Sequence, residues 1–318
     1  MTSEVLDVLI VNYNTAALLQ PMFDAMRRAD GAHRANYLVV DNASADDSLA
    51  CLARACPEAL VLANERNVGF GRANNQLVAH LKGKYALLLN TDAFVAADSL
   101  DKTLEYMDAH PECGILGVRL VGRDGELQPS CRHFPTPLNL FAVRTGLGRF
   151  FPGMRMVDDM TWDHASVREC DWLPGCFYLI RREVIEQVGL FDPRYFLYYE
   201  EVDHCKRVKQ AGWKVVYYPH TTVVHIGGES SRSVAEVEAA GRQISLLQIE
   251  SELLYFRKHH GLSGLALHLA LWSLGDFILA TKALLKGRGW PSARGFWRHA
   301  RTVWGLVFDT RFASQPTR

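Results

Sequence analysis

The sequence predicts an α/β fold in which a mostly parallel sheet is flanked by helices and followed by a C-terminal helical extension. Short apolar runs alternate with helical segments, and polar clusters follow several of those runs. Residues 255–318 are rich in apolar, tryptophan and basic residues, which indicates the extension. A length of 318 residues is enough for one large or two ordinary domains.

The composition excludes several classes of protein. With 48% hydrophobic and 22% charged residues, the chain is neither disordered, nor collagen-like, nor a polytopic membrane protein. Its 35 basic and 35 acidic residues give no net charge, so no nucleic-acid partner is expected. The seven cysteines form no C-x-x-C pair, which favours reduced thiols over a zinc cluster or a disulfide framework. The N-terminus has acidic Glu4 and Asp7 and no basic stretch, so no secretory signal is expected.

Residues 1–121 are expected to form five strands separated by helices. An apolar run that stops at polar residues, as Val5–Val11 does before Asn12, is typical of a buried strand that ends in a loop. Asp98 is a suitable N-cap for one of the helices. The expected strands are Val5–Val11, Tyr37–Val40, Leu60–Ala63, Tyr85–Leu89 and Ile115–Val121, and the expected helices are Ala16–Arg28, Asp47–Ala55, Gly71–Leu81 and Ser99–Ala109.

The pattern changes after residue 121. A hairpin turn is expected at Arg123–Glu126, and Pro129–Arg168 is expected to be irregular because it is rich in proline, glycine and aromatic residues. Further elements are expected at Trp172–Ile180 (strand), Arg182–Val188 (helix), Glu201 to about Ala211 (helix), Val215–Tyr218 and Thr222–His225 (strands) and Ser233–His260 (long helix).

The tail is basic: residues 255–318 contain ten Lys or Arg and two acidic residues. Leu262–Leu285 is long and apolar enough to span a bilayer. His268, Asp276 and Lys282 interrupt it, which favours a helical hairpin lying on or half-inserted in an anionic membrane surface. Four tryptophans would suit the interface: Trp272, Trp290, Trp297 and Trp304. The alternative is that these residues pack on the rest of the chain or form a homodimer.

Three polar clusters mark a candidate site, because ligands of parallel sheets gather at the carboxyl ends of the strands. Asn12–Thr15, Asp41–Ser44 and Asn90–Asp92 all follow expected strands and should converge. Asp92 could hold a divalent cation together with substrate phosphates, or it could cap the next turn. Asp41 could accept hydrogen bonds from a nucleobase or ribose, or it could form an Asx turn.

Three further features carry possible chemistry. Asn67-Val68-Gly69-Phe70-Gly71 allows a close approach of backbone to a ligand but matches no dinucleotide or Walker loop. The acidic residues Glu200, Glu201 and Asp203 could supply a general base, or they could form a solvated helix start. His225 precedes two glycines and could bind metal or diphosphate, although a lone histidine is more often structural.

Seven segments in this order resemble family 2 glycosyltransferases with the GT-A nucleotide-sugar-binding fold, most closely the bacterial rhamnosyltransferase-like branch. The resemblance covers about residues 5–230. The segments are Val11–Asn14, Val39–Ser44, Asn67–Phe70, Leu89–Asp92, Trp172–Gly175, Phe191–Asp192 and Tyr199–Asp203.

The resemblance implies a role for each site residue. Asp92 and His225 would bind Mg²⁺ or Mn²⁺, and Glu201, with Glu200 and Asp203 as alternatives, would be the catalytic base. Asn90 stands where the family has an Asp, and Glu201 also replaces an Asp. The donor-binding residues would be Asn12, Asn14, Asp41, Asn67, Gly69, Arg72 and Asn90. The acceptor-binding residues would be Trp172, Gly175 and Tyr199.

The implied activity is a metal-dependent, inverting transfer of a sugar, with L-rhamnose from dTDP-L-rhamnose as the first choice of donor. The acceptor would be a polyprenyl-diphosphate-linked saccharide in cell-wall or surface polysaccharide synthesis. The catalytic domain would span residues 1–232, with a donor half over 1–121 and an acceptor half over 122–232. Residues 233–318 would hold it peripherally at the cytoplasmic face of a bacterial inner membrane.

Other functions remain open from the sequence. UDP-sugar-dependent transfer of galactofuranose or glucose is the nearest alternative. A non-catalytic sugar- or lipid-binding protein is a second. A nucleotidyltransferase is disfavoured because Asn12-Tyr13-Asn14 contains neither the glycine nor the lysine of its phosphate-binding loop.

Overall fold

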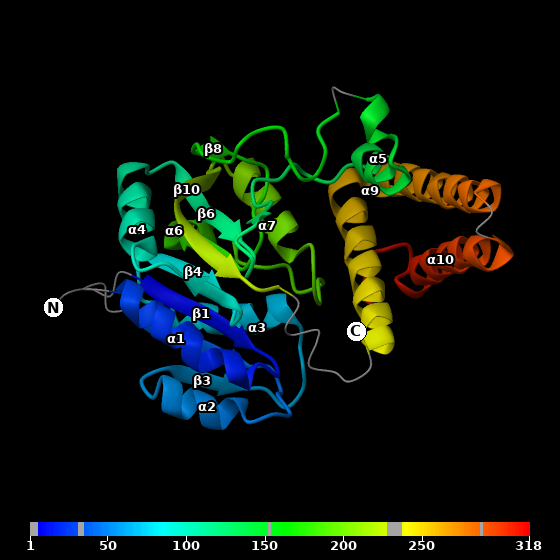
Figure 1. The fold of residues 1–318 in the computed structure, drawn as a ribbon. Helices are drawn as coiled ribbons and strands as arrows, with labels where there is room; N and C mark the ends of the chain where they lie inside the picture. Colours follow the sequence, from blue (N-terminus) through cyan, green and yellow to red (C-terminus); the bar gives the residue numbers. More distant parts are fainter. Residues whose placement is uncertain (1–5, 31–34, 152–153, 228–236, 287–288) are drawn as a thin grey trace.

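The computed structural model describes residues 6–30, 35–151, 154–227, 237–286 and 289–318 (Figure 1). The strands are β1 (Leu6–Asn12), β2 (Asn36–Asp41), β3 (Leu60–Ala63), β4 (Tyr85–Leu89), β5 (Ala93–Val95), β6 (Cys113–Val121), β7 (Leu127–Gln128), β8 (Arg168–Glu169), β9 (Phe177–Arg181) and β10 (Lys214–His225). The α-helices are α1 (Ala16–Asp30), α2 (Ser48–Ala55), α3 (Phe70–Leu77), α4 (Ser99–Ala109), α5 (Pro137–Thr145), α6 (Arg182–Val188), α7 (Glu200–Gln210), α9 (Val237–Leu285) and α10 (Gly289–Asp309). Two 3₁₀ turns are η1 (Val78–His80) and η2 (Leu147–Phe150).

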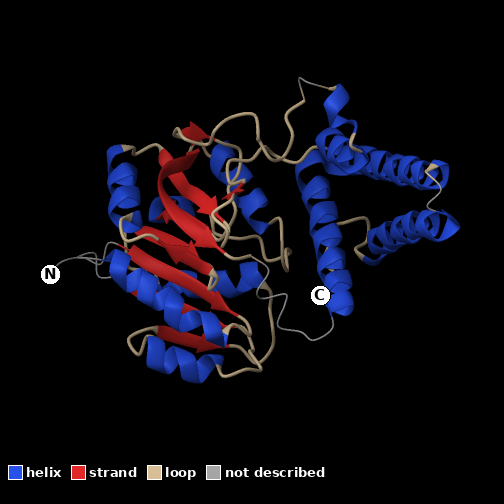
Figure 2. Cartoon of the chain, viewed as in Figure 1, coloured by secondary structure: helices blue, strands red, loops and turns tan. Residues whose placement is uncertain are grey.

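All the strands belong to one mixed sheet with helices on both faces (Figure 2). The strand order is β3-β2-β1-β4-β9-β6-β10-β5, and the first four strands are parallel to one another. β9 runs antiparallel to both β4 and β6, whereas β10 is parallel to β6. The carboxyl ends of β1, β2 and β4 therefore lie at the same edge of the sheet, as expected from the alternation of strands and helices.

Side chains of alternate residues along the strands enter two separate cores, one on each face of the sheet. In β1, Val8 and Ile10 pack against α1, α2 and α4, whereas Leu9 packs on the opposite side with α3, α6 and α7. The residues of β1 are almost all buried, which is why its sequence reads as a continuous apolar run.

The second half of the chain departs from the expected elements in three places. The two strands expected at Val215–Tyr218 and Thr222–His225 form one strand, β10, with an irregularity between Tyr218 and Thr222. Residues 129–168, expected to be irregular, contain helix α5, whose capping box pairs Thr136 with Asn139 and places Pro137 at its first position. The strand expected from Trp172 begins only at Phe177, after Pro174, which has no backbone N–H to donate to a ladder. The hairpin turn before β7 is confirmed, with Gly125 at φ 81°.

The C-terminal helices form an angled arm beside the sheet (Figure 1). Helix α9 bends sharply at Gly261, where φ is 66° and ψ is −166°. The part of α9 after the bend and α10 form an antiparallel helical hairpin, in which His299 Nδ1 lies 3.0 Å from Asp276 Oδ2. Within the described residues, one helix, α9, is long and apolar enough to cross a membrane by length and composition. The expected boundary between residues 232 and 233 lies outside the described residues.

The polar residues that interrupt the apolar part of α9 all face inward. Asp276 pairs with Arg144 of α5, and Lys282 Nζ donates to the carbonyl oxygen of Thr145 at 3.0 Å. His268 Nε2 lies 3.0 Å from Glu252 Oε1. Trp272, expected at a membrane interface, is instead buried, because its ring packs against His268 and beneath the Arg144 guanidinium.

Trp297 and Trp304 are exposed, with 56% and 42% of their surface open to solvent. The side chain of Trp290 lies outside the described part of the chain. The helical hairpin therefore buries Asp276 and His268, and it exposes large apolar groups together with the basic Arg298 and Arg301.

Candidate active site

A strand-end network of five polar side chains joins the ends of β1, β2 and β4. Asn12 Nδ2 donates to Asp41 Oδ1 at 2.7 Å and to Ser44 Oγ at 3.0 Å. The Thr15 hydroxyl lies 2.7 Å from Asn12 Oδ1 and 2.9 Å from Thr91 Oγ1. The expected convergence of the three polar clusters is therefore confirmed.

Asp41 and Asn14 shape this edge through internal hydrogen bonds. Asp41 is 2% exposed, and its carboxylate accepts from Asn12 and from both the hydroxyl and the backbone N–H of Ser44. Three of its roughly four acceptor positions are therefore occupied. Asn14 has a left-handed backbone, with φ 54°, and its Oδ1 accepts from the Ala45 N–H at 2.7 Å.

The loop after β3 is fixed by two asparagines. Asn42 Nδ2 donates to Asn67 Oδ1 at 2.8 Å, and Asn42 Oδ1 accepts from the Val68 N–H at 3.0 Å. Asn67 Oδ1 also accepts from the N–H of Gly69. Gly69 has φ 90°, and a Cβ there would lie 2.4 Å from the Phe196 carbonyl oxygen, so this position requires glycine.

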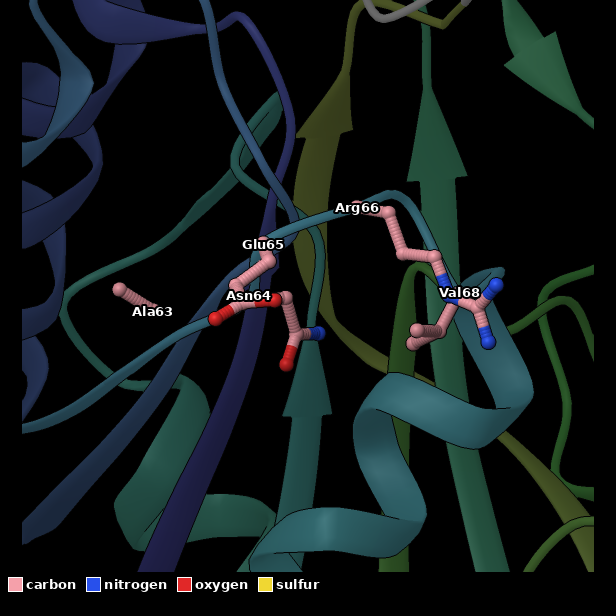
Figure 3. A pocket seen from close by; sticks show the side chains of 5 residues that line it. All are labelled: Ala63, Asn64, Glu65, Arg66 and Val68. Atoms are coloured by element: carbon pink, nitrogen blue, oxygen red, sulfur yellow. The ribbon is translucent and has the colours of Figure 1, made fainter.

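A cavity of about 530 Å³ lies along this loop. Its lining residues are Ala63, Asn64, Glu65, Arg66 and Val68 (Figure 3). The cavity follows β3 directly and is next to the end of β2, since the Asn64 N–H donates to the Asp41 carbonyl oxygen. An open hollow at the carboxyl edge of parallel strands is where the fold is expected to take a ligand. Arg72 lies apart from it, with Nε donating to the Pro193 carbonyl oxygen at 2.6 Å.

Asp92 and His225 meet at the end of β4 and the end of β10. His225 Nε2 lies 3.5 Å from Asp92 Oδ1. The N–H of Gly227 donates to Asp92 Oδ2 at 3.1 Å, and the N–H of Ile226 donates to the Asp92 carbonyl oxygen. The Asn90 side chain has no hydrogen-bond partner within the described residues. These contacts hold one carboxylate and one imidazole side by side.

Gln128 determines which nitrogen of His225 carries the proton. Its amide nitrogen must face the His225 carbonyl oxygen, 2.8 Å away, because a carbonyl can only accept. Its amide oxygen therefore faces His225 Nδ1 at 2.9 Å, so Nδ1 carries the hydrogen. Burial lowers the pKa of His225 despite the nearby charge of Asp92, so the ring is neutral near pH 7 and Nε2 presents a lone pair.

The donor atoms at this point fit a divalent cation. A lone pair on His225 Nε2 faces an anionic oxygen of Asp92, an arrangement that a cation between them would stabilise. No group of three or more His, Cys, Asp or Glu side chains suited to a metal occurs in the described part of the chain. Mg²⁺ commonly uses only one or two carboxylates and completes its shell with water and substrate phosphates, so this pair suits a site that the substrate completes.

The acidic turn, residues 198–203, is held in a costly backbone conformation. Tyr198 and Tyr199 have φ of 69° and 67°, a region that L-residues other than Gly, Asn and Asp rarely adopt. Glu200 and Glu201 follow at the start of α7, and each has a buried Oε2 without a hydrogen-bond partner. Burial raises the pKa of both carboxyls, and the charge of Glu201 raises the pKa of Glu200 further.

The two glutamates differ in their surroundings. Glu200 is 5% exposed, and a Cβ added at Gly71 would lie 3.6 Å from its own Cβ, so it packs beneath the start of α3. Glu201 is more accessible, and the positive charge of Arg132 partly opposes the rise of its pKa caused by burial. Burial and the charge of Asp92 raise the pKa of the Cys176 thiol to about 12, and the charge of Arg132 partly opposes that rise. Arg132 therefore acts electrostatically on both Glu201 and Cys176.

Asp203 is enclosed by cations. It is fully buried, and Arg207 Nε lies 2.9 Å, Lys258 Nζ 2.5 Å and His259 Nε2 2.7 Å from its carboxylate. Burial would raise the pKa of Asp203, but the hydrogen bonds from His259 and Lys258 and the charges of Lys258 and Arg207 lower it to about 2. A carboxylate held in this way is a poor proton acceptor. Its position instead joins α7 to α9.

The acceptor-side residues are positioned by contacts that the sequence does not reveal. Trp172 Nε1 donates to the His133 carbonyl oxygen, and the Arg132 guanidinium lies over its ring. The Tyr199 hydroxyl donates to Glu252 Oε2 of α9 at 2.9 Å. Gly175 approaches Phe70 and leaves space above its backbone. Gln128, Arg132 and Glu252 were not predicted, because no motif marks a residue that joins the site only by folding.

Comparison with known proteins identifies relatives of this chain. The family model described as "Glycosyl transferase family 2" matches residues 7–189. An N-acetylglucosaminyl-diphospho-decaprenol L-rhamnosyltransferase of Mycobacterium tuberculosis is 29% identical over 236 residues, which cover 70% of this chain and 76% of the relative. The rhamnosyltransferase WbbL of Escherichia coli K12 is 30% identical over 175 residues, covering 52% and 63%.

A solved structure shares the fold at lower identity. The mannosyltransferase PcManGT from Pyrobaculum calidifontis, in complex with GDP-Man and Mn²⁺, superposes with a TM-score of 0.56 and 15% identity. The superposition covers 98% of this chain and 88% of that one. The likeness supports the GT-A-type arrangement of a mixed sheet with flanking helices.

Proposed function

The chain belongs to glycosyl transferase family 2, and from this premise we propose that it transfers L-rhamnose from dTDP-L-rhamnose to a polyprenyl-diphosphate-linked saccharide. The family makes it a glycosyltransferase. The choice of sugar and acceptor is supported by the relatives named above, which are rhamnosyltransferases, one of them acting on a decaprenyl-diphosphate-linked sugar. The product would serve cell-wall or surface polysaccharide synthesis.

The observation that carries the proposal is the buried, unpartnered Oε2 of Glu201 at the start of α7. We assign Glu201 as the base because Glu200 packs under α3 and Asp203 is neutralised by cations. The Glu201 carboxylate takes the proton of an acceptor hydroxyl. The hydroxyl oxygen bonds to the anomeric carbon as the bond from that carbon to the nucleotide diphosphate breaks, which inverts the anomeric configuration.

The donor would lie along the carboxyl edge of the sheet. Its nucleoside would occupy the cavity lined by Asn64 and Arg66, next to Asp41 at the end of β2. Gly69, which has no side chain, and Asn67 would let the loop backbone come close to the donor, and Asn12 and Asn14 would hold the loops in shape. Asp92 and His225, with Asn90 nearby, would hold Mn²⁺ or Mg²⁺. When bound, this cation would neutralise the negative charge that develops on the leaving diphosphate.

The C-terminal helices would hold the enzyme at a membrane. The helical hairpin exposes large apolar side chains, namely Leu267, Leu274, Phe277, Leu284, Leu285, Trp297, Trp304 and Phe308. The same region carries the basic excess, so it would suit an anionic bilayer. We propose that residues 1–232 form the catalytic domain and that 233–318 attach it peripherally to the inner leaflet. Co-sedimentation with anionic vesicles tests this; failure to bind together with a dimer in solution would favour a homodimer interface.

One assay tests the proposed reaction. The purified protein is incubated with dTDP-L-rhamnose and a GlcNAc-diphosphate lipid acceptor in Mn²⁺ or Mg²⁺, and release of dTDP is measured. We expect acceptor-dependent release of dTDP and a product that is heavier by one deoxyhexose. Release of UDP from UDP-galactofuranose or UDP-glucose instead would show that the donor is a UDP-sugar. No release from any of these donors would overturn the catalytic function.

A further inference from the structure

We infer that the cavity between α5 and the segment after η2 binds the isoprenyl end of the acceptor, with Lys206 pairing its diphosphate. The inference rests on the proposed function and extends it to the acceptor site. The cavity measures about 540 Å³, within the usual range for small-ligand sites. Its lining combines the large apolar side chains of Phe134, Leu138, Phe151 and Met154 with five polar residues, namely His133, Thr136, Asn139, Arg155 and Asp171.

The cavity is preformed. Asn139 lines it, caps α5 through Thr136, and donates from Nδ2 to the carbonyl oxygens of Phe134 at 3.1 Å and Arg155 at 3.2 Å. Phe134 and Arg155 belong to different segments of the wall, so one buried amide holds these segments together. A ligand entering the cavity meets apolar surface without having to order these segments first.

Lys206 is a cation in need of an anionic partner. It is partly buried on α7, with Nζ 5.5 Å from the ring centre of Phe134 in the cavity wall. Its hydrogen-bonding neighbours, Tyr255 Oη and His260 Nε2, are both 3.4 Å away and neutral or basic. No carboxylate lies within 4.0 Å of it in the described residues, and Asp203 and Asp171 act on its charge only from farther away. A diphosphate beside it would supply the missing negative charge.

The order of groups matches the order of parts in a lipid-linked sugar. Lys206 follows Glu201 by five residues on α7, a rise of about 7.5 Å along the helix, and at about 100° per residue the two side chains leave the helix about 140° apart. An acceptor that met all three groups would therefore pass around α7, from a base to a cation to an apolar hollow. A saccharide, a diphosphate and an isoprenyl chain occur in that sequence in the proposed acceptor.

The cavity also lies toward the membrane side of the molecule. Leu138 and Phe151 are 55% and 52% exposed, although both are large and apolar. Helix α5 packs on α9, where Arg144 pairs with Asp276, so the cavity adjoins the helical hairpin proposed to contact lipid. A chain leaving the cavity would therefore reach apolar surface on the same side.

Equilibrium binding of farnesyl diphosphate tests the inference without turnover. Binding is measured below the probe's micelle concentration, in EDTA, with inorganic pyrophosphate as the probe that lacks the chain. Leu138→Asn should weaken binding of farnesyl diphosphate by about tenfold and leave pyrophosphate binding unchanged. Val143→Asn is the matched control, because Val143 is on the same helix, is 53% exposed and does not line the cavity.

The Lys206 variants test the diphosphate contact. Lys206→Met should weaken binding of both probes, and Lys206→Arg should restore it. The inference is overturned if farnesyl diphosphate binds no better than pyrophosphate, or if the variants at 138 and 143 weaken binding equally, as general attachment to lipid would require. If farnesyl diphosphate binds as expected but no sugar is transferred in the activity assay, the proposed function is refuted and the proposed lipid-binding site stands.

Discussion

The strand-end network and the acidic turn are both assigned to the proposed sugar transfer, but they are built in opposite ways. The network consists of neutral amides and hydroxyls around one carboxylate, and its polar atoms find partners among themselves. The acidic turn has left-handed tyrosines, two carboxylate oxygens without partners, and an aspartate enclosed by Arg207, Lys258 and the imidazole of His259. The comparison teaches that the proposed donor side is preorganised by satisfied contacts, whereas the proposed acceptor side keeps carboxylate oxygens without partners.

The largest effect should come from Glu201→Gln. Removing the base should lower kcat by about 10²- to 10⁴-fold while leaving the melting temperature unchanged. Glu200→Gln is the matched variant and should lower kcat far less. Equal losses in the two variants would contradict the distinction drawn between the glutamates.

The wild-type pH profile checks the same residue. Because burial raises the pKa of Glu201, protonation should reduce kcat/KM at a higher pH than for an ordinary carboxylate as the pH falls.

Asp203→Asn should instead affect stability. It leaves Lys258 and Arg207 without their buried anionic partner, which costs about 3–5 kcal/mol of unfolding free energy. Denaturant titration measures the loss. Asp24→Asn is the control, because Asp24 forms an exposed ion pair with Arg27 that should contribute less than about 1 kcal/mol. Full stability with lost turnover would mean that Asp203 acts in the chemistry.

Gln128→Leu should weaken Mn²⁺ binding by about 10- to 100-fold, since a residue behind a ligand fixes the ligand's tautomer and orientation. Mn²⁺ electron paramagnetic resonance in the presence of dTDP measures the affinity. Nitrogen-15 NMR of labelled histidine should show His225 protonated on Nδ1 in the wild type and a mixture of tautomers in the variant. An unchanged His225 tautomer and an unchanged Mn²⁺ affinity would show that Gln128 does not position His225.

Lowering the pH should remove part of the stabilisation that the Asp203 carboxylate gives to the folded chain. The pKa of Asp203 is about 2 in the folded chain and 3.8 for an unperturbed aspartate, so the unfolded chain takes up the proton first as the pH falls. The contribution is complete above pH 3.8 and disappears toward pH 2, about 2 kcal/mol in all. The stability gap between wild type and Asp203→Asn should shrink by that amount between pH 5 and pH 2. A constant gap would show that Asp203 does not titrate there.

The sequence was sufficient for the donor side because its parts are local. Each strand end carries its own polar cluster, and the parallel order of β1, β2 and β4 brings Asn12, Asp41 and Asp92 to one edge. The alternation of apolar and helical segments predicted that order. The start of α7 was likewise visible as a run of acids.

The acceptor side could not be predicted in the same way because it depends on contacts across long separations. Glu252 meets Tyr199 and Lys258 meets Asp203 only after α9 docks on α7. Helix α5 was missed because its nine residues are amid proline and aromatics, although Thr136 and Pro137 are a legible helix start. The inward orientation of Trp272 likewise depends on packing with α5 and α10, which periodicity within α9 does not reveal.

The left-handed backbone of Tyr198 and Tyr199 limits how this enzyme could be stabilised. Each costs on the order of 1–3 kcal/mol, and glycine at position 198 would remove that cost because it adopts φ 69° without strain. Tyr198 also packs against the hydrophobic core, so its replacement by glycine would exchange that strain for lost side-chain burial. The same freedom would let the two glutamates leave their positions, so variants that relax this turn would be poor catalysts.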